Sequence, residues 1–294
     1  GVNLNNDGAT GLTIASPGNI VRYNSAYGTM HNPMKTKYGD GYGWQASGGT
    51  RNRIFNNTLY KGGYGYPTFE AQSPWPRPLQ GFRWYQPSDS AGNVLKNNIV
   101  YGSYGAVAKG LEDIGDNPSA NVYFANNLCT NTDGEKCSVV GDPKFMNPSL
   151  TQTTSLVLPD LRLQSGSPAV DKGASLTTVI SAADQRHIRL ADPLYFQDGT
   201  WGAAMARGVT IFPDWIAIGS GSNIAQISSI NYSTGDIVLA SAPVNAIKSG
   251  DKVWLYTKSD GSRVFYGSAP DIGAYEREQV EVYPGPPQRL RNGS

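Results

Sequence analysis

A nine-residue pattern of polar and apolar positions recurs four times in the first half of the chain. Asparagine stands at its first and sixth positions, an aliphatic residue at the third and tyrosine at the ninth in residues 19–27, 52–60 and 93–101. The fourth copy, 122–130, keeps the central asparagine and has Phe124 at the third position. Repetition of this kind is typical of a solenoid in which each repeat forms one rung and contacts only its neighbours.

The central asparagines of the four copies are Asn24, Asn57, Asn98 and Asn127. Each is expected at a sharp bend between two short strands, because asparagine tolerates the left-handed backbone region better than any residue except glycine. Its amide can bond to the asparagine of the next rung, which predicts an asparagine ladder. The residue at the third position is expected to face the core. The spacings of 33, 41 and 29 residues are too uneven for a β-propeller, the main structural rival.

The pattern changes to antiparallel hairpins between Gly173 and Ser268. Alternating apolar runs at 215–218, 224–230, 236–239 and 252–256 are separated by turn residues such as Ser220-Gly221 and Asp260-Gly261. We therefore predict an all-β chain: a right-handed parallel β-helix over 1–175, an inserted small antiparallel β-barrel or sandwich over 176–266, a return strand within 267–277 and an extended tail over 278–294. A stabilising cap is the favoured role of the inserted module, and carbohydrate binding is the alternative.

Composition and charge narrow the functional class. The 24 basic and 23 acidic residues nearly cancel, so the chain lacks the electrostatic footprint of a nucleic-acid-binding protein. We expect no membrane span, because no run approaches the roughly 20 apolar residues that a spanning helix needs. The opening residues do not resemble a signal peptide, so we expect a mature or trimmed piece that can lack N-terminal rungs.

The two cysteines, Cys129 and Cys137, enclose the turn-forming Thr132-Asp133-Gly134. A disulfide across this loop and two unpaired thiols are both open, and a disulfide would fit an oxidising, extracellular setting. The chain carries no zinc-ligand spacing, phosphate loop, nucleophile elbow or dinucleotide-binding motif.

The Asn-Asn-x-aliphatic-Tyr rungs resemble the right-handed parallel β-helix (pectate-lyase-like) superfamily. A second block supports this resemblance: Asp142-Pro143-Lys144-Phe145, then Leu-Arg-Leu-Gln-Ser-Gly-Ser-Pro-Ala-Val-Asp-Lys-Gly at 161–173, then Ser-Ala-Pro-Asp-Ile-Gly-Ala-Tyr-Glu at 268–276. This order is similar to the C-terminal end of secreted bacterial β-helix proteins. The resemblance covers 10–175 and 266–277, and it implies a secreted or virion-surface protein with a polysaccharide or cell-surface glycan as partner.

In the lyases and hydrolases of this fold, substrate lies in a groove along the first strand of each rung. Here we expect first strands at 12–15, 42–46, 81–84 and 105–109, and long insertions at 28–43 and 61–80 form the walls. A lyase needs a cation near the uronate carboxylate and a base for the C5 proton. The candidate catalytic residues are Arg83, Lys37 and Asp40. The candidate substrate-binding residues are Tyr42, Gln45, Tyr64, Tyr66, Glu70, Trp75 and Lys109.

Each of these assignments has a structural alternative. The aromatic side chains can pack on the wall of the solenoid, and Arg83 can form a surface salt bridge. Glu112, Asp113 and Asp116 are expected in an acidic loop, where calcium is a candidate cofactor and an ordinary solvated turn is favoured.

The sequence favours an extracellular polysaccharide lyase over a glycoside hydrolase, which would want two or three carboxylates in the groove. The competing class is a non-catalytic carbohydrate-binding, adhesin-like or phage-tailspike-like protein, and a tailspike would be a trimer. The sequence leaves open the glycan, catalysis itself, the metal and whether the protein is a monomer or a trimer.

Overall fold

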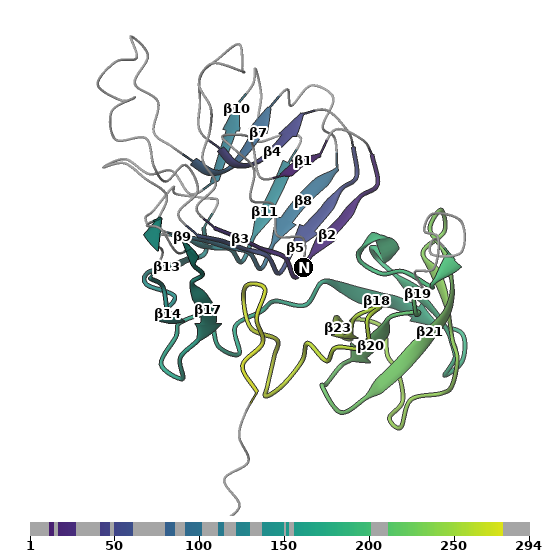
Figure 1. The fold of residues 1–294 in the computed structure, drawn as a ribbon. Helices are drawn as coiled ribbons and strands as arrows, with labels where there is room; N and C mark the ends of the chain where they lie inside the picture. Colours follow the sequence, from purple (N-terminus) through teal and green to yellow (C-terminus); the bar gives the residue numbers. More distant parts are fainter. Residues whose placement is uncertain are drawn as a thin grey trace, which may run out of the picture.

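The protein is all-β in a computed structural model of the chain (Figure 1). The described residues are 12–14, 17–27, 42–47, 50–60, 80–85, 92–101, 111–114, 122–129, 137–149, 151–152, 156–200 and 211–278.

Three parallel sheets form the N-terminal half: in four successive passes the chain adds one strand to each sheet, and β13 then adds a fifth strand to the third sheet. The first sheet contains β1 (Leu12–Ile14), β4 (Tyr42–Ser47), β7 (Gln80–Tyr85) and β10 (Leu111–Ile114) in that order. The second sheet has the order β11 (Val122–Ala125), β8 (Asn93–Lys96), β5 (Arg53–Phe55) and β2 (Ile20–Arg22). The third sheet has the order β13 (Val139–Val140), β12 (Leu128–Cys129), β9 (Ile99–Tyr101), β6 (Thr58–Tyr60) and β3 (Ser25–Tyr27).

The predicted asparagine ladder connects the second and third sheets. Asn24 donates from Nδ2 to Asn57 Oδ1 at 3.1 Å, Asn57 to Asn98 at 3.0 Å and Asn98 to Asn127 at 3.0 Å. The last three asparagines are fully or almost fully buried. Since a buried amide needs partners for both its oxygen and its nitrogen, stacking identical amides satisfies each rung with the next.

The sequence analysis placed the left-handed residue of each bend at the ladder asparagine, and this was wrong. The left-handed residue is the one before it. Positive φ angles occur at Tyr23 (54°), Asn56 (50°), Asn97 (56°) and Asn126 (54°). The reason is that the left-handed residue turns the chain, while the next residue points its amide along the stack. The asparagines at the bend also bond to one another, from Asn126 Nδ2 to Asn97 Oδ1 at 2.8 Å.

The inner core lies between the second and third sheets. Ile54 and Leu95, at the third position of their copies, pack with Leu59 and Val100, and Val21 and Phe124 pack against this cluster. The inward orientation predicted for the third position is therefore confirmed. Cys129 and Cys137 also belong to this core and form a disulfide, which decides between the two alternatives left open by the sequence.

Two antiparallel strand pairs follow the parallel sheets. β14 (Phe145–Asn147) pairs with β17 (Asp160–Leu163), and β15 (Thr151–Gln152) pairs with β16 (Leu156–Val157). Phe145, Leu161 and Leu163 form a second core with Tyr60 and Ile99 of the third sheet. The third sheet is thus covered on the face opposite to the inner core.

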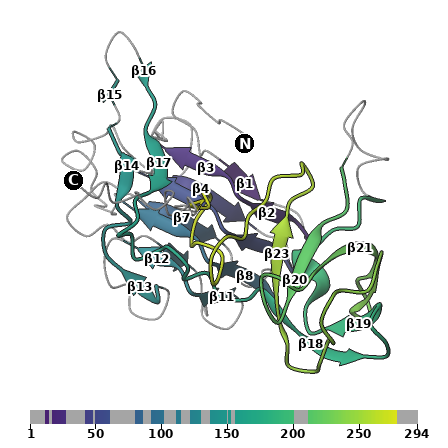
Figure 2. The ribbon, with the colours of Figure 1, turned by 90° about the horizontal axis from the view of Figure 1, so that it is seen from below.

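A closed antiparallel barrel follows, as the alternating pattern of the sequence predicts (Figures 1 and 2). Its strand order is β18 (Thr177–Ala182), β19 (His187–Leu190), β22 (Asp236–Leu239), β21 (Ile224–Asn231), β20 (Trp215–Ile218) and β23 (Lys252–Thr257), which pairs again with β18. A 3-10 turn, η3 (Pro193–Tyr195), lies between β19 and β20. Phe55 and Val94 of the second sheet share the core of the barrel, so the two parts pack directly against each other.

The segment 271–275 returns to the parallel sheets, but it is not the strand predicted there. Gly273 N donates to Asn97 O at 2.9 Å, and Ala274 N donates to Thr58 Oγ1 at 2.9 Å. Gly273 has φ +102°, and a Cβ added there would lie 2.6 Å from Ile99 Cδ1. The segment is not a strand because the residues at and next to the bends offer it single acceptors and no strand edge. Its backbone approaches Ile99 so closely that position 273 needs a glycine.

Candidate functional site

The first parallel sheet carries the candidate groove residues that the structure describes. Arg83 of β7 is the register partner of Gln45 of β4 and of Glu112 of β10. These three residues, here called the Arg83 row, lie on three adjacent strands. Gln45 and Arg83 were predicted on neighbouring rungs, and their register confirms this. Neighbouring strands lie about 4.8 Å apart, so a cation and a carboxylate occupy adjacent positions on this sheet.

The fourth strand of the first sheet is β10, at Leu111–Ile114 and not at 105–109 as expected, and 105–109 lies outside the described residues. Leu111 pairs with Phe82 and Ile114 with Tyr85, whereas 105–109 contains only one bulky apolar residue, Val107. Glu112 and Asp113 therefore belong to a strand and not to an acidic loop. The register of β10 is what places Glu112 at the position next to Arg83.

Most of the other candidates lie outside the described residues. Tyr42 is in β4 as the register partner of Gln80. The candidates outside the described residues are Lys37, Asp40, Tyr64, Tyr66, Glu70, Trp75, Lys109 and Asp116.

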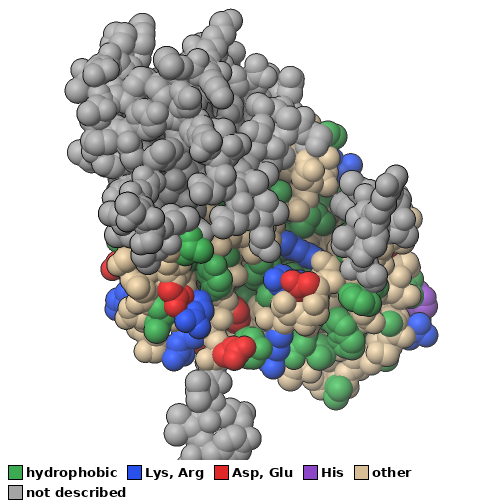
Figure 3. All heavy atoms as spheres, viewed as in Figure 1, with side chains coloured by type: hydrophobic (Ala, Val, Ile, Leu, Met, Phe, Trp, Pro, Cys, Tyr) green, Lys and Arg blue, Asp and Glu red, His purple; other side chains and the backbone are tan. Residues whose placement is uncertain are grey.

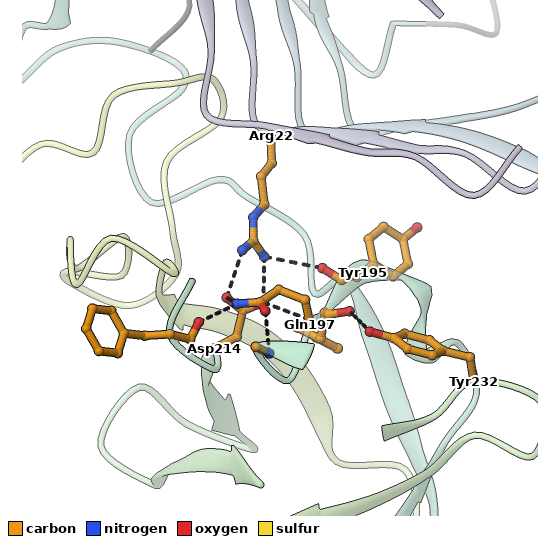
Figure 4. A network of polar contacts seen from close by, with 8 residues as sticks. Arg22, Tyr195, Gln197, Asp214 and Tyr232 are labelled. Atoms are coloured by element: carbon orange, nitrogen blue, oxygen red, sulfur yellow. Dashed lines mark hydrogen bonds and ion pairs between the residues drawn. The ribbon is translucent and has the colours of Figure 1, made fainter. Parts of the chain in front are cut away.

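A buried ion pair fixes the barrel to the second sheet (Figure 4). Arg22 of β2 donates from Nη1 and Nη2 to the two carboxylate oxygens of Asp214, both at 2.7 Å. Asp214 is completely buried and also accepts from Gln197 N at 3.0 Å. Tyr232 donates to Phe196 O at 3.1 Å, and burial raises the pKa of its hydroxyl. Because these groups satisfy one another, the network is structural.

Acidic residues of the two C-terminal motifs form a cluster in which Asp271 is buried and Glu276 is half-buried. Asp271 accepts from Asp171 N at 2.7 Å and from Arg277 N at 2.8 Å. Glu276 accepts from Tyr266 N and Asp271 N at 2.8 and 2.7 Å. The motif carboxylates therefore fold the return segment by accepting backbone N–H groups.

Burial, and then repulsion from Asp271, raise the pKa of Glu276 to about 9. Burial is also the main cause that raises the pKa of Asp271, to about 6. The backbone N–H groups that donate to both carboxyls oppose these shifts but do not reverse them. Glu276 is therefore protonated in the folded protein at neutral pH.

This cluster predicts that stability falls as the pH rises. A pKa that is higher in the folded state gives stability that is complete below the unfolded value of about 4.3 and is lost as the pH rises toward 9. Glu276→Gln should reduce the slope of unfolding free energy against pH, between pH 5 and 9, by up to about 1 kcal/mol per pH unit. Urea titrations at several pH values measure this slope. Glu278→Gln, at an exposed position, is the control, and equal slopes in both variants would contradict the prediction.

The sequence analysis missed the residues that hold the two parts together. Arg22 and Arg53 are charged residues in otherwise apolar strands, and this was the available signal. Arg53 Nη2 lies 2.7 Å from Asp192 Oδ2. It also missed Arg263, whose signal was its place among aromatic residues in Arg-Val-Phe-Tyr at 263–266.

On the face shown in Figure 3, basic and acidic side chains of the described residues are intermixed. Among the described residues, no group of three or more His, Cys, Asp or Glu side chains could hold a metal ion. Within the same residues, no helix has the length and apolar character needed to cross a membrane. No protein-family model matches this chain, and neither does any curated protein.

Proposed function

We propose that the three parallel sheets are the faces of a right-handed parallel β-helix of the pectate-lyase-like kind. Support comes from the strand order, in which four successive passes of the chain each add one strand to each sheet, and from the asparagine ladder at one bend. The disulfide supports an oxidising location outside the cell. The order of the C-terminal motifs supports the same family.

We further propose that the first sheet binds a uronate-containing polysaccharide and cleaves it by β-elimination. The observation that carries this proposal is the Arg83 row, with one cation flanked by Gln45 and Glu112 in register. A guanidinium group matches a uronate carboxylate, and its charge stabilises the anion that forms when the C5 proton leaves. The base takes the C5 proton, the electron pair of the C5–H bond forms the C4=C5 double bond as the C4–O4 bond breaks, and the departing O4 oxygen takes a proton from water. Lys37 is the proposed base for the C5 proton, and Asp40 is the third proposed catalytic residue; both lie outside the described residues.

The assay is incubation of the full chain with pectins, alginates and glycosaminoglycans, with and without calcium. Cleavage produces unsaturated uronates, which absorb in the ultraviolet. Arg83→Ala should lower the rate on the order of 100-fold, because it removes a charge that stabilises the transition state, and Arg83→Lys should lower it less. Arg162→Ala is the matched control, since Arg162 is exposed and paired with Asp160 on β17.

Absence of unsaturated product from every substrate would contradict the lyase proposal for those glycans. Binding of the same glycans without cleavage would favour the alternative, a non-catalytic carbohydrate-binding protein. A trimeric solution mass would point to the tailspike-like form of that alternative.

A further inference from the structure

A second site lies on the barrel, outside the first sheet. It is a pocket of about 600 Å³ lined by the loop 219–222, by Trp254 and Tyr256 of β23, and by Arg263 and Phe265. Trp254 and Phe265 are in edge-to-face contact, with ring centroids 5.7 Å apart. The pocket therefore combines aromatic side chains with a cation, and none of these residues takes part in the mechanism proposed for the first sheet.

Arg263 is held between two tyrosine rings. Its guanidinium carbon lies 4.9 Å from the ring centroid of Tyr256 and 4.2 Å from that of Tyr266. Its Nε donates to Phe265 O at 2.7 Å. In the part of the chain that the structure describes, no carboxylate pairs with Arg263, and its terminal nitrogens make no hydrogen bond. A fixed, exposed guanidinium with free N–H groups is suited to bidentate binding of a carboxylate.

Trp254, which lines the pocket, carries an unsatisfied polar group. Only 8% of the residue is exposed, and its Nε1 is buried without a hydrogen-bond partner. A buried donor without an acceptor costs about 1–3 kcal/mol, and in a native structure such a group calls for an explanation.

The loop 219–222 brings hydroxyl groups to the same pocket. A Cβ added at Gly221 would lie 2.8 Å from Phe265 Cε2, so only glycine allows the loop to approach this ring so closely. Ser220 and Ser222, on either side, have hydroxyl oxygens 3.2 Å apart. Hydroxyl groups suit the hydroxyls of a sugar, and aromatic rings suit its C–H face.

We propose that this pocket binds the carboxylate of a single acidic sugar residue, a uronate unit, through Arg263. The ring contacts favour a sugar over a simple carboxylate ion, and the unpaired guanidinium favours an acidic sugar over a neutral one. The pocket would hold a glycan on the barrel independently of the first sheet. Binding at this pocket does not require that the Arg83 row performs catalysis.

The test is calorimetric titration of the full chain with trigalacturonate, and with galactotriose as the uncharged comparison. The Arg83→Ala chain is titrated so that binding at the barrel is measured separately. In that background, adding Arg263→Gln should weaken trigalacturonate binding at least about tenfold, which corresponds to about 1.4 kcal/mol. Arg189→Gln, at an exposed arginine paired with Asp236 on another side of the barrel, should leave binding unchanged. Galactotriose should bind more weakly than trigalacturonate.

The Arg263→Lys variant separates loss of binding from a folding defect. It keeps the positive charge but lacks the planar guanidinium group that binds a carboxylate with two hydrogen bonds. It should bind trigalacturonate less tightly than the parent chain and more tightly than the glutamine variant. Three results would each overturn the proposal: equal binding by the Arg263→Gln and Arg189→Gln variants, equal affinity for the two sugars, or no binding of trigalacturonate by the Arg83→Ala chain. A failed lyase assay would leave these results intact, so the two proposals fail separately.

Discussion

Replacing Asp214 with alanine is expected to lower the free energy of unfolding by about 3–5 kcal/mol. Both carboxylate oxygens of Asp214 accept from the guanidinium of Arg22, and only 10% of the Arg22 side chain is exposed. Removing the carboxylate leaves a buried cation without its counter-charge and Gln197 N without its acceptor. Equilibrium unfolding in urea, measured on both chains, gives the difference.

Two further variants separate the charge effect from general damage to the barrel. Asp236→Ala removes an exposed ion pair with Arg189 and should cost at most about 1 kcal/mol. The double variant Arg22→Met with Asp214→Leu removes both charges and keeps apolar volume, so it should recover most of the lost stability. If Asp214→Ala cost no more than Asp236→Ala, the pair would not be an important link between barrel and sheet.

The parallel strands and the asparagine ladder could be predicted from the sequence because each copy of the nine-residue pattern repeats the same local rule. Asn57 and Asn98 occupy equivalent positions in their copies, and position alone predicts that they stack. The left-handed residue was misplaced by one position because the Asn-Asn pair offers two residues that tolerate a positive φ. The first rung has Tyr23 at the bend, where no propensity would place a left-handed residue.

The candidate site was less predictable because it depends on register and on distant partners. The position of Glu112 is next to that of Arg83 only because β10 begins at Leu111, and the sequence before Leu111 gives no local signal of that start. Arg22 and Asp214 are 192 residues apart, and the inserted barrel brings them together. No period in the sequence connects such positions. Arg263 differs, because its partner rings, Tyr256 and Tyr266, lie close to it in the sequence.

Asn98→Ala is expected to cost on the order of 4 kcal/mol, a loss comparable to that of the buried ion pair. Asn98 Oδ1 accepts from both the backbone N and the Nδ2 of Asn57, each at 3.0 Å. Asn98 Nδ2 donates to Ile54 O and Asn127 Oδ1, each at 3.0 Å. Alanine removes all four bonds at a site from which water is excluded, and each buried group left without a partner costs about 1–3 kcal/mol. Urea unfolding of the full chain measures the loss.

Asn24→Ala is the matched control, since Asn24 is the same residue type in the same ladder. Asn24 is only half-buried, and its side chain makes bonds to Asn57 Oδ1 and Arg22 O. Water can replace part of what alanine removes there, so its cost should be about 1 kcal/mol. Asn98→Asp tests whether amide donation matters, because a carboxylate keeps the shape but cannot donate to Ile54 O. If Asn98→Ala and Asn24→Ala cost the same, the ladder would be a repeated shape without energetic weight. A steep difference would show that its stability comes from buried amides with a rung on either side.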